Sequence, residues 1–287
     1  LHKEYRRQRQ MCIRDSKSAV VNAILYQTAA NLKKFVEPGT AEEKQLKHFF
    51  DQLSVKAVER LGWEAVEKES DDDKLTRPYV LNAALYAENA QAIAEAHRLF
   101  TAHQADLISL PAAIRPLVLA NEVKHFGSQE LFDKLLSAYR QTPDASYKSD
   151  LCVALTGTPD ATLIKQLIEK FEDAETIKPQ DLRAWYYRTL ANDDGQQAAW
   201  DWIRQEWSWL EEKVGGDMEF ATYITVTSQV FRSADRLAEF RAFFEPKINT
   251  PGLTREIKMD IKVITSRVNL VEAESSAVNA AIAEATK

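Results

Sequence analysis

Apolar residues recur along most of the chain at the three- and four-residue spacing of an amphipathic helix. Leu81, Ala84 and Leu85 follow this spacing, and a second apolar stretch resumes after a polar break at 88–91. A helix, a short turn and a second helix are therefore expected in this segment. Strand-like alternation of β-branched residues is nearly confined to 223–226. The pattern predicts an all-α protein.

This two-helix unit recurs along the middle of the chain. Four such segments begin at Leu81, Leu117, Leu151 and Leu182, so that successive starts differ by 36, 34 and 31 residues. Stacked α-hairpins give a drifting period of about 34 residues, because each hairpin buries its open face against the next. The sequence therefore predicts an α-solenoid, a superhelix of HEAT- or armadillo-like helical hairpins.

Two Thr-Pro-Asp tripeptides, at 142–144 and 158–160, have the composition of helix starts. Threonine can cap a helix, proline is tolerated at the first helical position, and aspartate interacts favourably with the positive end of the helix dipole. We expect Thr142 and Thr158 to act as the caps.

Residues 1–16 differ from the rest of the chain in charge. They include five basic and two acidic residues, whereas the whole chain has 37 Lys and Arg against 43 Asp and Glu. A basic tail that binds an anionic partner, a targeting peptide and a sequence-assembly artefact are the three alternatives. The chain begins with Leu1 and not Met, and the segment resembles adapter read-through, so we interpret 1–16 as an artefact or a disordered tail. Residues 17–287 are then expected to form a single α-solenoid domain, a fragment of a longer protein.

Composition and charge indicate the cellular compartment of the protein and exclude some classes of binding partner. Two cysteines are too few for a disulfide framework, which favours a reducing, cytoplasmic location. No apolar run approaches the roughly 20 residues of a membrane span. The net charge of −6, without a basic stripe, argues against nucleic-acid binding. We therefore expect a cytoplasmic protein that binds neither a membrane nor nucleic acid.

Motifs of catalysis are missing from the sequence. None of the five histidines stands in the HExxH spacing that places two zinc ligands on one helix face. The stretch GGDME at 215–219 lacks the Asn of a substrate-binding Gly-x-Met-Glu-Asn loop and is interpreted as a helix end and a turn. Cys152 lies in an apolar helix, where a thiol is usually a small buried hydrophobic group. We expect neither a catalytic residue nor a metal site in this chain.

The densest cluster of side chains is aromatic. Trp200, Ile203 and Trp207 share one helix face, while Trp202 and Trp209 share another. Such rings could stack on a ligand. The alternative, which we favour, is a helix that packs on both sides and needs large residues on two faces.

Three collinear stretches resemble the C-terminal helical domain of the aminopeptidase N family of zinc exopeptidases, with its lactic-acid-bacterial members the most similar. They are LGWE at 61–64 followed by Leu75 and Arg77, NxxGxxxAWxWIxxxW at 192–207, and FRS at 231–233 followed by LxxFxxFF at 237–244. The resemblance covers the chain from about residue 19 to its end.

The resemblance implies a division of labour between two domains. In this family an upstream catalytic domain has the HExxH zinc site, and the C-terminal domain closes over that site, encloses a cavity and contacts the peptide. This chain would then be the lid and substrate chamber of a zinc-dependent aminopeptidase that removes N-terminal residues from peptides. It would be inactive alone, with zinc bound only in the full-length enzyme. Its partners would be peptide substrates and the upstream catalytic domain of the same polypeptide.

Candidate peptide-binding residues follow from the same resemblance. Arg77 stands where an Arg recurs in the family, and Tyr187 and Arg188 lie on the helix that opens the fourth unit. An inward-facing Arg could bind the C-terminal carboxylate of a peptide by a bidentate contact. For Arg77 the alternative is a structural ion pair with a nearby acid such as Asp73.

A second hypothesis belongs to a different functional class. A self-sufficient helical-repeat scaffold would use its concave surface to bind a protein partner. Such a scaffold should begin with Met and a polar capping helix, whereas a fragment of an enzyme should begin abruptly.

Overall fold

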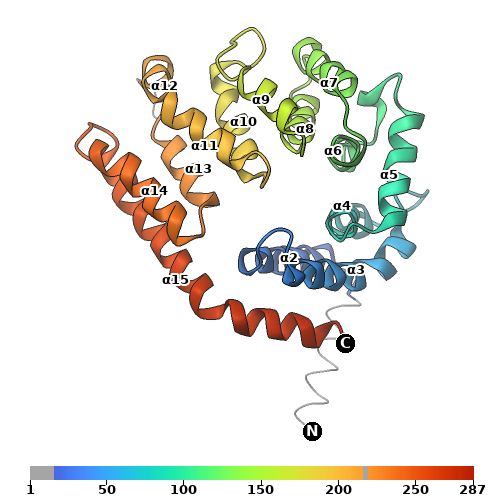
Figure 1. Ribbon diagram of the computed structural model, residues 1–287. Helices are drawn as coiled ribbons and strands as arrows, with labels where there is room; N and C mark the ends of the chain where they lie inside the picture. Colours follow the sequence, from blue (N-terminus) through green and yellow to red (C-terminus); the bar gives the residue numbers. More distant parts are fainter. Residues whose placement is uncertain (1–15, 216–218) are drawn as a thin grey trace. The chain divides into compact units, whose positions relative to one another are not determined.

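The computed structural model describes residues 16–215 and 219–287, and helices are the only regular secondary structure among them (Figure 1). The predicted all-α class is therefore confirmed. The interpretation of 1–16 as an artefact or a tail falls, apart from Ser16, outside the described residues, as does most of the turn expected at 215–219. The single solenoid domain over 17–287 stays a prediction.

Contacts divide the chain into two compact units. Unit 1 comprises Leu1–Glu122 and Glu274–Lys287, and unit 2 comprises Val123–Ala273. The longer helices that begin in the first part of unit 1 are α2 (Ala19–Ala30), α3 (Ala41–Leu61), α4 (Asp71–Tyr86), α5 (Ala90–Ala102) and α6 (Arg115–Phe126). Short 3-10 helices, η1 (Asn31–Phe35) and η2 (Leu107–Ser109), lie among them.

Unit 2 consists of shorter helices followed by one long helix. They are α7 (Gln129–Gln141), α8 (Ala145–Thr156), α9 (Ala161–Ile168), α10 (Pro179–Ala191), α11 (Gln196–Gln205), α12 (Trp207–Val214), α13 (Thr222–Val230), α14 (Ala234–Phe244), η3 (Glu245–Lys247) and α15 (Thr254–Ala285). The final turns of α15 belong to unit 1, where Ile282 is buried in the core.

The helix–turn–helix expected after Leu81 is the pair α4 and α5. Its turn ends at Asn89, whose side chain accepts a hydrogen bond from the backbone N–H of Ala92 and so caps α5. The β-branched stretch at 223–226 lies within α13, where Tyr223 and Ile224 are buried. Burial of one helix face thus overrides the strand preference of this short segment.

The helix starts at the Thr-Pro-Asp tripeptides differ from expectation in one respect. Asp144 and Asp160, and not Thr142 and Thr158, are the N-caps of α8 and α9. Each Asp accepts hydrogen bonds from backbone N–H groups inside its helix, while each Thr hydroxyl accepts one from the N–H of that Asp. The N-caps of α8 and α9 therefore lie two residues later than the sequence indicates.

The aromatic cluster forms the core of unit 2. Trp200 and Ile203 are fully buried, Trp207 is 6% exposed and Trp202 is 4% exposed. Trp200 meets Phe231 edge to face, with ring centroids 5.1 Å apart. Trp200 and Trp202 lie on different faces of α11 and both are buried, so the expectation of large residues on two faces is confirmed for α11. The expectation that Trp207 and Trp209 continue the same helix was wrong, because α11 ends at Gln205 and these two residues belong to α12.

Replacing Trp200 with Ala should destabilise the chain by about 3–5 kcal/mol, because the lost ring leaves a cavity in a packed core. Urea unfolding followed by circular dichroism measures this loss. The half-buried Trp209 supplies the control, since Trp209→Ala should cost clearly less. An equal cost for the two variants would contradict this account of the core.

A buried carboxyl group joins α13 to α15. The Asp260 carboxyl accepts hydrogen bonds from Ser228 Oγ at 2.9 Å and from Thr225 Oγ1 at 3.1 Å. Burial raises the pKa of Asp260, and these two hydroxyl groups oppose the shift only in part. Arg267 is also half-buried, but its guanidinium donates to the carbonyl oxygens of Ser228 and Phe231. Ionisation of Asp260 therefore works against folding.

Stability should fall as pH rises from about 4 through the raised folded-state pKa of Asp260, because over that window the folded chain binds more protons than the unfolded chain. Asp260→Asn should remove this part of the pH dependence and lessen the stability difference between pH 4 and pH 7. Thermal unfolding across this range tests it, with the exposed Glu272→Gln on the same helix as control. If the slope of stability against pH were the same in Asp260→Asn as in the unsubstituted chain, the prediction would be wrong.

Candidate functional site

Three helices of unit 2 line a pocket of ≈ 210 Å³. Among its lining residues are Tyr139 from α7, Lys148 and Cys152 from α8, and Asp181, Trp185 and Arg188 from α10. We call it the Arg188 pocket. It brings one of the three candidate peptide-binding residues together with a second cation and an aromatic floor.

The floor of the Arg188 pocket is held by a chain of hydrogen bonds. Trp185 Nε1 donates to Tyr139 Oη at 3.1 Å, and Tyr139 Oη donates to Asp181 Oδ2 at 3.2 Å. The two rings also meet edge to face with centroids 4.8 Å apart. Burial raises the pKa of Tyr139 to about 12, so the phenol remains a hydrogen-bond donor at neutral pH. This floor is rigid and already oriented.

The charged groups of the Arg188 pocket give it an excess of positive charge. Lys148 and Arg188 face one acid, Asp181, which accepts the Tyr139 hydrogen bond. Arg188 is half-buried, and its guanidinium donates no hydrogen bond to another residue of the described chain. A free guanidinium beside an apolar floor is suited to a carboxylate joined to an apolar group.

Cys152 contributes only packing to this pocket. Its side chain is buried, and burial raises the pKa of the thiol to about 12. The thiolate is the nucleophilic form, so this thiol is inert at neutral pH. The interpretation of Cys152 as a small buried hydrophobic group is confirmed.

Tyr187 does not line the Arg188 pocket. Successive residues of a helix point about 100° apart, and Tyr187 is 36% exposed on another face of α10. The structure therefore brings Arg188 to a pocket and leaves Tyr187 on the surface of the same helix. A peptide contact by Tyr187 stays a prediction.

Arg77 lies in unit 1, and its donors are used within the chain. Its Nη1 donates to Glu69 Oε2 at 3.0 Å and its Nη2 contacts Glu69 Oε1, so the two side chains form a buried ion pair. Nη2 also donates to Leu61 O at 3.0 Å, and Nε donates to Gly62 O at 3.1 Å. A peptide contact by Arg77 is untested, and these contacts favour the structural role.

The prediction that Asp73 is the acid that pairs with Arg77 was wrong. Asp73 accepts hydrogen bonds from Arg60 Nη1 at 2.5 Å and from Ser70 Oγ at 2.9 Å, and Ser70 caps α4 by accepting from the N–H of Asp73. Glu69 lies in the loop before α4, and this loop reaches the guanidinium of Arg77. The ion pair was expected, but with an acid one helical turn further along the chain.

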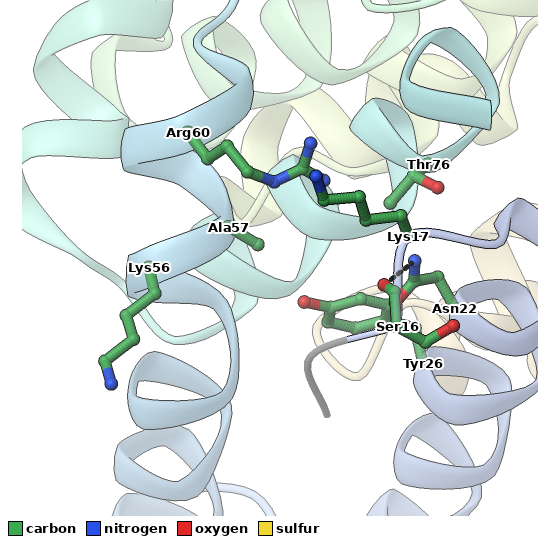
Figure 2. Close-up of a pocket in the computed structure, with 8 residues that line it drawn as sticks. All are labelled: Ser16, Lys17, Asn22, Tyr26, Lys56, Ala57, Arg60 and Thr76. Atoms are coloured by element: carbon green, nitrogen blue, oxygen red, sulfur yellow. Dashed lines mark hydrogen bonds between the residues drawn. The ribbon is translucent and has the colours of Figure 1, made fainter. Parts of the chain in front are cut away.

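A second pocket, in unit 1, also has a volume of ≈ 210 Å³ (Figure 2). Its lining residues include three basic ones, Lys17, Lys56 and Arg60. Figure 2 shows Lys56 pointing away from the other labelled side chains. The hydrogen bond from Arg60 lowers the pKa of Asp73, and the charge of Lys17 adds to this effect. Two of the three cations thus neutralise Asp73, and the pocket is explained as packing at the start of α4.

The described part of the chain contains neither a metal-binding cluster nor a helix suited to cross a membrane. Across 16–215 and 219–287, no three His, Cys, Asp or Glu side chains are grouped so that they could bind a metal ion. The donor set of a catalytic zinc site is therefore not met by this part of the chain. Within the same ranges, no helix combines the length and the apolar character that a bilayer crossing requires.

Comparison with known sequences places the chain in a family. The profile of the ERAP1-like C-terminal domain matches residues 11–266. Aminopeptidase N of Lactobacillus helveticus is 58% identical over 271 residues, which cover 94% of this chain and 32% of that protein. Aminopeptidase N of Lactobacillus delbrueckii subsp. lactis is 48% identical over 272 residues, 95% of this chain and 32% of the relative. That of Lactococcus lactis subsp. cremoris is 41% identical over 271 residues.

The described residues are all-α, which is the fold class that the resemblance implied. The family profile also matches most of the length of the chain. The chain belongs to the ERAP1-like C-terminal domain family, and is a C-terminal helical domain of the aminopeptidase N family. It spans about a third of the length of the relatives that it matches.

Several residues of the Arg188 pocket were missed by the sequence analysis. Tyr139 and Lys148 come from α7 and α8, and no spacing along the chain links them to Arg188. Asp181 stands seven residues before Arg188 on α10, which is a spacing of about two helical turns. The available signal was that Trp185 and Arg188 stand three residues apart on one helix, which places an indole and a guanidinium on neighbouring positions of one face.

Proposed function

We propose that this chain is the lid and substrate-chamber domain of a cytoplasmic, zinc-dependent aminopeptidase that removes N-terminal residues from peptides. The proposal rests on the 58% identity to an aminopeptidase N over 94% of the chain, at only 32% of the length of that relative. The catalytic zinc site would belong to the remainder of the polypeptide. This identity favours part of an enzyme over a stand-alone scaffold.

The same proposal includes the α-solenoid. Neighbouring helices of the described chain pack in pairs, as α7 does with α8 and α10 with α11. Contacts also join α8 to α10 and α10 to α13, so that one pair packs on the next. A continued stack of this kind would enclose a chamber that excludes water and limits which peptides enter.

Within such a chamber, the Arg188 pocket would bind the C-terminal end of a peptide. Arg188 would contact the terminal carboxylate, Lys148 would add a second positive charge, and the Trp185 floor would contact the last side chain. Asp181 would not repel the ligand strongly, because the phenol of Tyr139 donates to it. This geometry supports Arg188 more than Tyr187 or Arg77 as a peptide-binding residue.

The chain alone should bind peptides but not hydrolyse them. Incubation with an aminoacyl p-nitroanilide and zinc should release no chromophore above a control that contains a chelator, because the described residues do not group into a zinc site. Turnover above the chelated control would refute the assignment of catalysis to the remainder of the polypeptide.

The Arg188 pocket should distinguish a peptide with a free C-terminal carboxylate from the same peptide amidated. A charge-assisted hydrogen bond contributes about 1.5 kcal/mol or more, so the free acid should bind roughly tenfold more tightly by calorimetry. Arg188→Ala should abolish this difference, while Arg140→Ala, at an exposed position of α7, should leave it intact. If both variants changed the preference for the free acid equally, Arg188 would not be the residue that binds the carboxylate.

A further inference from the structure

A pocket of ≈ 230 Å³ in unit 1 is unlike the others in its chemistry. Its walls include Val55, Val58 and Trp63, and its two charged lining residues are Glu59 and Glu95. We propose that this pocket, the Trp63 pocket, binds an alkyl cation, namely the side chain of a Lys or Arg residue of a peptide. Methylene groups would pack on the indole, and the cation would contact the carboxylate of Glu59, because Glu95 is already paired with Arg98.

The apolar walls of the Trp63 pocket are suited to the stem of such a side chain. Trp63 is 7% exposed, Ala84 and Ala92 also line the pocket, and Val55 is 36% exposed. Lys and Arg bury their methylene groups on apolar surface while the charged head stays at the polar rim. A cation near the face of an indole also gains electrostatic attraction from the ring.

The lining residues select the sign of the ligand charge. Both charged lining residues are acids, and no Lys, Arg or His lines the pocket. Arg98 donates to both carboxylate oxygens of Glu95 at 2.9 and 2.7 Å, which lowers the pKa of Glu95 and fixes its orientation. Glu59 has no hydrogen bond or ion pair with another residue of the described chain. One carboxylate is thus oriented, and the other is free to contact a ligand.

A hydrated metal ion would fit this pocket poorly. Hard cations require several oxygen ligands, and no group of three His, Cys, Asp or Glu side chains occurs among the described residues. The walls are also mainly apolar, which favours an organic cation over an inorganic one.

The position of Trp63 depends on the Arg77 ion pair. Gly62, which follows the last residue of α3, has φ 61° and ψ −172°, a conformation that side chains other than Gly rarely adopt. Arg77 donates to the carbonyl oxygens of Leu61 and Gly62 and so fixes the turn immediately before Trp63. Arg77 is therefore a positioning residue of the Trp63 pocket, and Glu69 holds its guanidinium in place.

The inference rests on the proposed function only in assigning the cation to a peptide. The pocket itself can be tested with n-butylguanidinium, which carries the alkyl stem and charge of an Arg side chain, and with n-butylurea, its neutral isostere. Calorimetric or NMR titration of the chain should show n-butylguanidinium binding about tenfold more tightly. Equal binding of the two probes, or no saturable binding of either, would overturn the proposal.

Separate variants test the residue that would contact the ligand, Glu59, and the turn that positions Trp63, at Gly62. Glu59→Gln, at an exposed position, should weaken n-butylguanidinium binding about tenfold, while Glu67→Gln, an exposed acid of the following loop, should not. Gly62→Ala should weaken binding at least fivefold by shifting Trp63, with the Arg77 ion pair retained. Unchanged binding in Glu59→Gln would overturn the contact, and unchanged binding in Gly62→Ala would overturn the claim that the turn held by Arg77 positions Trp63.

The readouts also distinguish this inference from the proposed function. Carboxylate recognition by the Arg188 pocket should be unaffected in Gly62→Ala, since that pocket lies in unit 2, and its retention shows that unit 2 of the variant is folded. An unchanged circular dichroism spectrum shows the same for the helices of unit 1. A Lys-containing peptide should bind more tightly than its norleucine analogue, and Glu59→Gln should cancel the advantage. If n-butylguanidinium binds but the two peptides bind equally, the assignment to a peptide is wrong although the cation site exists.

Discussion

The buried ion pair of Arg77 and Glu69 is the interaction on which the geometry of unit 1 depends. A guanidinium in a dry interior is costly unless acceptors meet its donors, and here a carboxylate and two backbone carbonyl oxygens do so. Those carbonyl oxygens belong to the turn that ends α3, so the ion pair also sets the direction in which the chain leaves the helix. Trp63 follows directly, and its indole becomes the wall of a pocket.

In unit 2 the constraint is the burial of large rings on two faces of the helices. Trp185 is buried, yet its N–H needs an acceptor, and Tyr139 supplies one while itself donating to Asp181. The requirement that buried polar atoms be paired therefore orders the floor of the Arg188 pocket without any contribution from a ligand. Lys148 lies over the Tyr139 ring, 5.2 Å from its centroid, and the half-buried Arg188 has no hydrogen bond to another described residue.

Helix periodicity was read correctly from the sequence, whereas the exact caps of α8 and α9 and the partners distant in the chain were not. The hairpin after Leu81 and the buried face around Trp200 follow from spacing within one or two helices, so periodicity alone reveals them. The acid that meets Arg77 depends on the path of the loop that contains Glu69, and neighbouring acids look equivalent in the sequence. The Arg188 pocket needs three helices to be placed before Lys148 can be recognised as part of it.

The two pockets use one physical arrangement with opposite signs of charge. Each combines a buried aromatic wall with partly exposed charges, acids beside Trp63 and cations beside Trp185. Exposed charges are screened by water and salt and contribute modestly to affinity, so contact with the apolar wall must supply much of the binding free energy. The charges then act mainly by rejecting ligands of the wrong sign, because a like charge placed against the ring would lose hydration without gaining a partner. If the domain binds peptides as proposed, this arrangement would select them by the sign of charge at a few positions and tolerate variation elsewhere along the peptide.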